Sequence, residues 1–256
     1  RSTQAKTLFP YTTLFRSSVD AGQPRMEREL MRKLSVLGSP ISHSKSPAIH
    51  KAAYQVLGLD WEYQKQEVLK GGLRPFMDQL DPEWLGFSLT MPLKEEAARF
   101  ATSLDQFAEQ TGAANTLVRT DSGWAGFNTD IYGMLQAVRL ANLGTLDRFL
   151  VIGSGATATS AMVTISQLTP GGKVRIFARN RQTRKDLAAF GKSLGLSVRI
   201  TNSLERAIRW ADLSLATLPG GALSEWSTRL AANPGFKPRG AIFDVAYEPW
   251  PSEFAA

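Results

Sequence analysis

The chain has 256 residues, of which 43% are hydrophobic, and a formal net charge of +7 that is spread over scattered lysines and arginines. This pattern favours phosphate-bearing small ligands over nucleic acid as partners, and the absence of cysteine excludes disulfides and thiolate chemistry. With two histidines and no apolar run near the ~20 residues that span a bilayer, the sequence predicts no metal site, no membrane segment and a cytoplasmic location.

The first 32 residues lack the period of a helix or a strand. The stretch 7–17 has neither the apolar core nor the small-residue cleavage site of a signal peptide. We therefore expect residues 1–32 to be a non-native or disordered extension, with Met26 or Met31 as the natural start.

Residues 33–130 predict a first region in which strands alternate with helices. A strand over 33–38 ends at Gly38, and Ser46-Pro47 opens a helix whose apolar residues share one face. The residues of that face are Ile49, Ala52, Ala53, Val56 and Leu57. Further elements are expected at 61–68 (strand), 73–80 (helix), 86–90 (strand), after Pro92 (helix) and at 115–119 and 123–127 (a hairpin). This alternation predicts βαβ units and a mostly parallel sheet.

Residues 131–256 predict a second region of the same class, joined to the first by a helix that begins at Asp130. An apolar strand at 148–152 is followed by a glycine-rich turn and a helix. Later strands are expected at 174–178, 197–200, 213–217 and 241–245, with helices near 184–194 and 204–210. The fold class is therefore α/β, with two α/β domains.

The turn after residue 152 has the pattern Gly153-x-Gly155-x-x-Ala158, between a strand and a helix. Gly153 permits a tight turn, Gly155 lets the backbone approach a pyrophosphate, and Ala158 allows close packing of helix on strand. The helix N-terminus then offers unpaired N–H groups to phosphates. The pattern predicts a Rossmann-type dinucleotide site, although a glycine turn without a ligand remains the alternative.

The residues after the next strand indicate which dinucleotide is bound. An NAD site usually has an acid there, whereas Ala178 is followed by Arg179, Asn180 and Arg181. Arginine binds a 2′-phosphate with two parallel hydrogen bonds, so NADPH is favoured unless these arginines form only a solvated face. The predicted cofactor-binding residues are Gly153, Gly155, Ala156, Ala158, Arg179, Arg181, Arg184 and Thr217.

Four polar motifs in the first region are more specific than the glycine turn. They are Ser42–Pro47, Ser88–Lys94, Gly112–Thr116 and Gly126–Asp130, and together they suit a polyhydroxylated carboxylate without a metal. From about Leu34 to Ala256 the chain resembles the shikimate dehydrogenase family, with these motifs in family order. The resemblance implies that Lys94 and Asp130 are the catalytic pair. It also implies substrate-binding roles for Ser44, Ser46, Thr90, Asn115 and Tyr247.

The chemistry of the pair fits that resemblance. A lysine ammonium can protonate the alkoxide that forms when a ring ketone is reduced, and an aspartate can hold the ammonium in place. Taken alone, Lys94 could be a surface lysine and Asp130 a helix N-cap. The expected reaction is the NADPH-dependent reduction of 3-dehydroshikimate to shikimate, by a monomer or homodimer. The alternatives are a quinate/shikimate dehydrogenase that uses NAD and a non-catalytic shikimate-binding protein.

The sequence departs from the family pattern in three places. Ser88 replaces a common asparagine, and Ala156 replaces a common glycine. The family also continues past the segment of Tyr247 with a helix that carries a substrate-binding glutamine. We therefore expect the NADP-binding region to lack a C-terminal return helix and the chain as written to have weak or absent activity.

Overall fold

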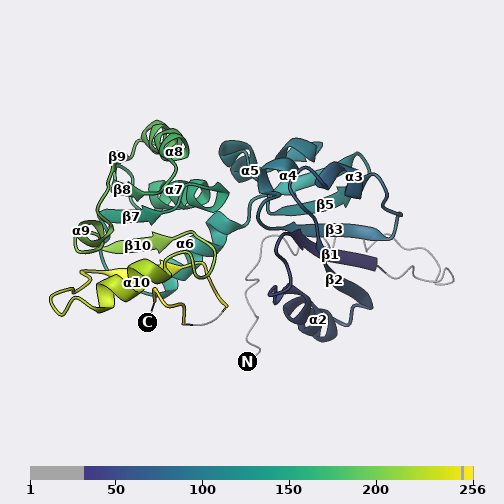
Figure 1. Cartoon of the computed structure of the whole chain (residues 1–256). Coiled ribbons are helices and arrows are strands. Elements are labelled where there is room, and N and C mark those ends of the chain that lie inside the picture. The colour runs from purple at the N-terminus through teal and green to yellow at the C-terminus, as the bar shows by residue number, and fades with distance from the viewer. Residues whose placement is uncertain (1–31, 249–250, 256) are drawn as a thin grey trace, which may run out of the picture. The chain divides into compact units, whose positions relative to one another are not determined.

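The computed structural model describes residues 32–248 and 251–255, and within them the chain forms two β-sheets with flanking helices (Figure 1). Of the extension expected at residues 1–32, only Arg32 is described, and it begins the first strand. The rest of that prediction lies outside the described residues. Within the described ranges, no helix is long and apolar enough to cross a membrane.

The first sheet has the strand order β2-β1-β3-β5-β6-β4 in the described residues. β1 pairs in parallel with β2 and β3, whereas β5 and β6 form the expected antiparallel hairpin. The elements are β1 (Arg32–Gly38), α2 (Ser46–Leu57), β2 (Trp61–Glu67), α3 (Leu73–Met77), β3 (Trp84–Leu89), α4 (Lys94–Phe100), β4 (Ser103–Leu104), α5 (Gln106–Thr111), β5 (Thr116–Thr120) and β6 (Gly123–Phe127).

The loops that follow β1 and β3 lie side by side at the carboxyl edge of this sheet. The Ser39 N–H donates to the Met91 carbonyl oxygen over 2.9 Å, and the Thr90 N–H donates to the Leu37 carbonyl oxygen over 2.9 Å. Gly38 makes this approach possible, because a Cβ there would collide with the Thr90 side chain. The first and second polar motifs are thus adjacent at the edge where α/β sheets bind ligands.

Helix α2 turns to the sheet a different face from the one that its apolar residues predict. Ile49, Val56 and Leu57 are 65%, 87% and 63% exposed, whereas Tyr54 is buried. The Tyr54 ring meets the Trp61 ring of β2 edge-on, with centroids 5.5 Å apart. Aromatic packing on the edge strand therefore sets the rotation of the helix, and its aliphatic stripe stays largely exposed.

The second sheet is entirely parallel, with the order β11-β10-β7-β8-β9 in the described residues. Counted along the chain from β7, this is the 3-2-1-4-5 order of a Rossmann sheet. The elements are α6 (Asp130–Leu140), β7 (Arg148–Ile152), α7 (Ala156–Leu168), β8 (Lys173–Phe177), α8 (Arg181–Ser193), β9 (Ser197–Ile200), α9 (Leu204–Ile208), β10 (Leu213–Ala216), α10 (Ser224–Ala231) and β11 (Ala241–Asp244).

Strand β7 lies at the centre of the second sheet and is buried on both faces. Phe149 and Val151 pack with residues of α6, α7 and α8, whereas Leu150 and Ile152 pack with residues of α9 and α10. Successive side chains of a strand point to opposite faces, so the apolar run Phe149–Ile152 serves two layers of helices. The strand order reverses between β7 and β10, and open α/β sheets bind ligands at the carboxyl ends of the strands at such a point.

Candidate active site

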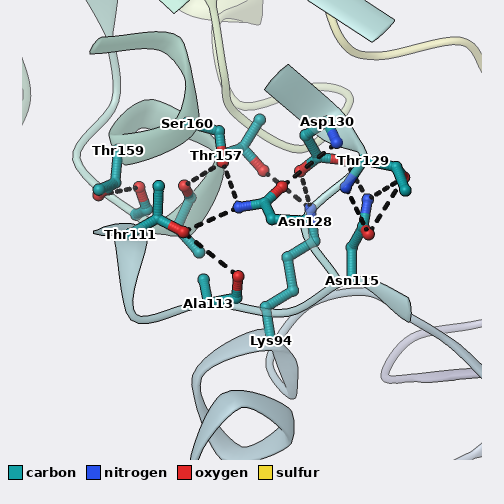
Figure 2. A network of polar contacts seen from close by, with 12 residues as sticks. Lys94, Thr111, Ala113, Asn115, Asn128, Thr129, Asp130, Thr157, Thr159 and Ser160 are labelled. Carbon is teal, nitrogen blue, oxygen red and sulfur yellow. Dashed lines mark hydrogen bonds and ion pairs between the residues drawn. The ribbon is translucent and has the colours of Figure 1, made fainter. Parts of the chain in front are cut away.

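Lys94 and Asp130 lie 36 residues apart in sequence and form an ion pair in the structure. Lys94 is the first residue of α4 and Asp130 is the first residue of α6. The Lys94 Nζ donates to Asp130 Oδ2 over 2.5 Å (Figure 2). The two side chains are 14% and 22% exposed, so water screens their attraction only partly. The structure thus brings together the two residues predicted to be catalytic.

Asn115, the residue before β5, holds the other oxygen of Asp130. Its Nδ2 donates to Asp130 Oδ1 over 2.6 Å and to Thr129 Oγ1 over 2.9 Å, while its Oδ1 accepts from the Thr129 N–H over 3.0 Å. Thr129 occupies the N-cap position of α6, where no side chain caps the helix. The Asp130 carboxylate is therefore committed to Lys94 and Asn115 rather than to a helix cap.

Asn128 is a buried amide that the sequence analysis quoted in a motif without giving it a role. Its Nδ2 donates to Thr111 Oγ1 over 2.9 Å and to Ser160 Oγ over 3.0 Å, and its Oδ1 accepts from the Asp130 N–H over 3.2 Å. The side chain is 1% exposed. It links α5, α6 and α7, and so connects Asp130 to the helix behind the glycine turn (Figure 2).

Thr157 is a second residue near the pair that was given no role from the sequence. Lys94 Nζ donates to Thr157 Oγ1 over 3.3 Å (Figure 2). Thr157 is the second residue of α7, directly after the glycine turn. A hydroxyl next to such a turn was the only sequence signal, and it does not reveal a partner 63 residues away.

The predicted carboxylate-binding serines lie near a partly buried tyrosine, Tyr63. The Ser46 N–H donates to Ser44 Oγ over 3.3 Å, and the Tyr63 hydroxyl donates to Ser88 Oγ over 2.7 Å. Burial raises the pKa of Tyr63, and hydrogen bonds with Ser88 and Ser46 only partly oppose this. Tyr63 therefore stays a protonated donor near neutral pH, beside the serines of the first motif and the serine that replaces asparagine.

Thr90 and Tyr247 lie in different segments of the chain and have different neighbours. Thr90 is in the loop that leads into α4, and its carbonyl oxygen accepts from the Leu93 N–H over 2.9 Å. Tyr247 is 48% exposed, and its ring lies 6.3 Å from that of His43. An ion pair between Lys45 and Glu248 joins the same two segments. Tyr247 is thus placed beside the first motif.

Gly153 gives the glycine turn its tight bend. Its φ is 122°, and its N–H donates to the Phe177 carbonyl oxygen of β8 over 2.9 Å. A Cβ at this position would collide with Thr217 Oγ1. Thr217 itself donates to the Ile152 carbonyl oxygen over 2.9 Å. Thr217 therefore acts as a support under the turn, and only glycine fits above it.

The backbone at Gly155 faces open space. A Cβ added there would have no heavy atom within 4 Å. Gly155 is the N-cap residue of α7, a helix of 13 residues that begins at Ala156 and has no side-chain cap. Ala158 is fully buried against the sheet. Free N–H groups at the end of a long helix, with room for close approach, fit a dinucleotide pyrophosphate.

The three predicted phosphate-binding arginines are in different environments. Arg179 and Arg181 are exposed, and neither makes a hydrogen bond or ion pair within the described part of the chain. Arg184 instead donates through Nη1 to Asn202 Oδ1 over 3.0 Å and to the Ala178 carbonyl oxygen over 3.4 Å. Arg184 braces the turn after β8, which leaves Arg179 and Arg181 free to reach a phosphate.

The described residues contain no group of three or more histidine, aspartate or glutamate side chains that could hold a metal ion. The polar partners of Lys94 and Asp130 are the Thr157 hydroxyl and the Asn115 amide. A Rossmann sheet with an open glycine turn, next to a helix that contacts this pair, defines a two-domain α/β protein of the dinucleotide-binding class.

Comparisons with known proteins narrow this class to one family. Residues 36–117 match the model of the shikimate dehydrogenase substrate binding domain. The chain is 34% identical over 227 residues to "Shikimate dehydrogenase (NADP(+))" of Aeropyrum pernix. This match covers 88% of the present chain and 81% of that relative. The chain belongs to the shikimate dehydrogenase family.

Solved structures agree with this assignment. The crystal structure of Mycobacterium tuberculosis shikimate dehydrogenase matches with a TM-score of 0.74 at 35% identity, over 88% of this chain and 82% of that one. A Thermus thermophilus shikimate 5-dehydrogenase in complex with NADP(H) and shikimate matches with a TM-score of 0.72 at 28% identity, over 88% and 82% of the two chains. The fold therefore has an N-terminal substrate domain and a Rossmann-type domain.

Proposed function

We propose that the protein is an NADP-dependent shikimate dehydrogenase, which reduces 3-dehydroshikimate reversibly to shikimate with NADPH. The observation that carries this proposal is the Lys94–Asp130 pair, with Lys94 also bonded to the helix that follows the glycine turn. Relatives named for this activity, and a related structure that holds NADP(H) and shikimate, support it. We assign substrate binding to residues 33–130 and NADP binding to residues 131–256.

The residues that would hold the cofactor belong to the glycine turn and to the arginine-rich segment after β8. The N–H groups behind Gly155 suit the pyrophosphate, and Arg179 and Arg181 suit a 2′-phosphate because no acid follows β8. When bound, the cofactor supplies the hydride that reaches the substrate carbon. The carboxylate of an NAD site would repel a 2′-phosphate. Because no acid follows β8, this site favours NADP over NAD.

Lys94 has the chemistry to act as the proton donor. An ammonium group has three N–H donors, and two of them face Asp130 and Thr157. The third remains for the ketone oxygen of the substrate. As negative charge develops on that oxygen, Lys94 donates a proton to it, and in the oxidative direction the neutral amine takes the proton back. Asp130 holds the ammonium in place during this exchange.

The remaining predicted residues would bind the other polar groups of the substrate. The hydroxyls of Ser44 and Ser46 suit the carboxylate, and the Tyr63 hydroxyl donates to Ser88 beside them. We assign Thr90 and Asn115 to the ring hydroxyls, and Asn115 is bonded to Asp130 of the pair. Tyr247 would close the pocket from the segment that follows β11. The monomeric or homodimeric state and the absence of nucleic-acid partners stay predictions.

The test is an absorbance assay of nicotinamide reduction with shikimate or quinate, each with NADP⁺ or NAD⁺. We expect shikimate with NADP⁺ to be the best pair. Faster turnover of quinate with NAD⁺ would favour a quinate/shikimate dehydrogenase. If no pair reacts but shikimate still binds, a non-catalytic binding protein is the better description. Binding is measured by calorimetry in the same buffer.

A further inference from the structure

The first two turns of α7 carry hydroxyls that contact the catalytic pair or its immediate support. Thr157 accepts from Lys94, and Ser160 accepts from Asn128, whose own amide oxygen accepts from the Asp130 N–H. Residues three apart on a helix lie on the same face, so Thr157 and Ser160 form one polar edge of α7. This edge belongs to the helix that begins at the glycine turn, yet it faces the substrate-domain residues (Figure 2).

The lysine needs two fixed contacts to aim its remaining donor. Its ammonium ends a flexible four-carbon stem, and an ion pair with Asp130 alone would let the stem swing around that contact. Thr157 supplies a second contact from a different helix. With two N–H groups held from two directions, the third has one direction left, which is the geometric condition for efficient proton transfer.

Thr157 is well placed to be that fixed contact. It is half-buried in the first turn of α7, and the chain just before it is anchored by the bond from the Gly153 N–H to β8. Threonine is β-branched, so its hydroxyl has few rotamers. The same backbone that forms the glycine turn therefore holds the Thr157 oxygen. Through this contact, the position of the Lys94 ammonium depends on the position of the turn.

We propose that Thr157 is a positioning residue for Lys94, through which the cofactor-binding helix sets the direction of proton transfer. This rests on the proposed function, since it assigns Lys94 the proton transfer of shikimate dehydrogenation. Thr157 touches neither the reacting carbon nor the oxygen in this assignment; it acts through the lysine. Its hydroxyl, rather than its bulk, carries the role.

Three variants separate the hydroxyl from the shape of the side chain. Thr157→Val keeps the branched shape without the hydroxyl, and Thr157→Ser keeps the hydroxyl. Thr159→Val is the matched control, because among the described residues the Thr159 hydroxyl bonds only to the Gly155 carbonyl oxygen at the start of its own helix, over 3.4 Å. Steady-state kinetics with shikimate and NADP⁺ are measured for all three, together with thermal unfolding.

We expect Thr157→Val to lower kcat about tenfold, which corresponds to ~1.4 kcal/mol of transition-state stabilisation. The KM for NADP⁺ should stay near that of the wild type, since the turn itself is unchanged. Thr157→Ser should recover most of the loss, and Thr159→Val should match the wild type. A wild-type kcat for Thr157→Val, or equal losses for Val and Ser, would overturn the proposal.

A second readout does not depend on turnover. Mass spectrometry measures how fast an amine-directed acylating reagent modifies Lys94 in the wild type and in each variant. Freeing the ammonium from Thr157 should raise the rate several-fold in Thr157→Val and leave it unchanged in Thr159→Val. If the wild type shows no shikimate oxidation but this difference persists, the proposed function fails and the contact stands. Equal modification rates in all variants would refute the role of Thr157.

Discussion

Lys94 and Asp130, the proposed catalytic pair, differ from the glycine turn in how many of their polar groups are already bonded within the protein. Both oxygens of Asp130 accept hydrogen bonds, and Lys94 contacts two partners. At the cofactor side, the backbone of Gly155 faces open space, and Arg179 and Arg181 have no partner among the described residues. The groups that we propose to be catalytic are thus already bonded within the protein, whereas the groups that we propose to bind phosphate have no such partner among the described residues.

This difference predicts two kinds of kinetic defect. Groups held in place before the reaction contribute through the transition state, so their loss should lower kcat. Groups that bond only to the ligand contribute equally to ground and transition states, so their loss should raise KM with little change in kcat. Variants on the two sides test whether this division holds.

The largest effect is expected from Lys94→Ala. Removing the proton donor should lower kcat about 100- to 10,000-fold, the range found for general acids. Shikimate binding, measured by calorimetry, should persist because Ser44, Ser46 and Asn115 remain. Lys70→Ala is the control, because Lys70 is exposed and makes no ion pair among the described residues. Near-normal turnover in Lys94→Ala would exclude its catalytic role.

Gly153→Val should act on the cofactor side instead. The backbone there has a φ of 122°, and the new Cβ would collide with the Thr217 hydroxyl. Strain of about 1–3 kcal/mol should displace the turn and weaken NADPH binding by up to about 100-fold. Fluorescence titration with NADPH measures this. Gly133→Ala, where a Cβ meets nothing within 4 Å, is the control. Unchanged NADPH affinity in Gly153→Val would argue against this turn as the cofactor site.

Arg179→Ala should reduce the preference of the protein for NADPH over NADH. A hydrogen bond to a charged group is worth about 1.5–3 kcal/mol, so the KM for NADPH should rise roughly tenfold or more. The KM for NADH should not change, because NADH lacks the 2′-phosphate, and it serves as the internal control. An equal rise in KM for both cofactors would mean that Arg179 does not bind the 2′-phosphate. Arg181→Ala would then be the next variant.

The smallest effect concerns stability and pH, away from the catalytic pair. Burial would raise the pKa of Asp212, but hydrogen bonds from Arg148, from the Asp147 and Arg148 N–H groups and from Arg239 lower it to about 2. A carboxyl with a depressed pKa stabilises the fold above its unfolded-state pKa, and this stability is lost as the pH falls through the folded value. The contribution of Asp212 should therefore disappear between about pH 4 and pH 2.

Asp212→Asn tests this linkage. Discounted for partial exposure, the lost stability near neutral pH is about 1–2 kcal/mol, which lowers Tm by roughly 2–8 °C. The gap in Tm from the wild type should shrink as the pH falls toward 3. Asp60→Asn, at an exposed position without a hydrogen bond among the described residues, should show no gap. A gap for Asp212→Asn that grows on acidification would contradict the sign of the effect.

The sequence predicted the elements whose signals are local. The apolar strand at 148–152, the glycine turn and the hairpin of β5 and β6 were confirmed because strand period and turn chemistry depend on neighbouring residues. The rotation of α2 was not predictable, because it depends on aromatic contacts with β2 rather than on its aliphatic stripe. Family and fold class were confirmed by the comparisons.

The candidate site shows the same limit. The motifs located Lys94 and Asp130, and the structure places them in contact. The contacts of Thr157 and Asn128 could not be predicted from the sequence, because their partners lie far along the chain. Packing of α7 brings Thr157 to Lys94 and Ser160 to Asn128. The roles assigned to Ser44, Thr90, Tyr247 and the arginines stay predictions.

A crystal structure with NADP⁺ and shikimate bound tests the central claim most directly. We predict that Lys94 Nζ lies within hydrogen-bond distance of both Asp130 and the shikimate hydroxyl that is oxidised, with nicotinamide C4 facing the carbon that bears it. Shikimate bound away from Lys94, or a Lys94 side chain turned away from Asp130, would contradict the account.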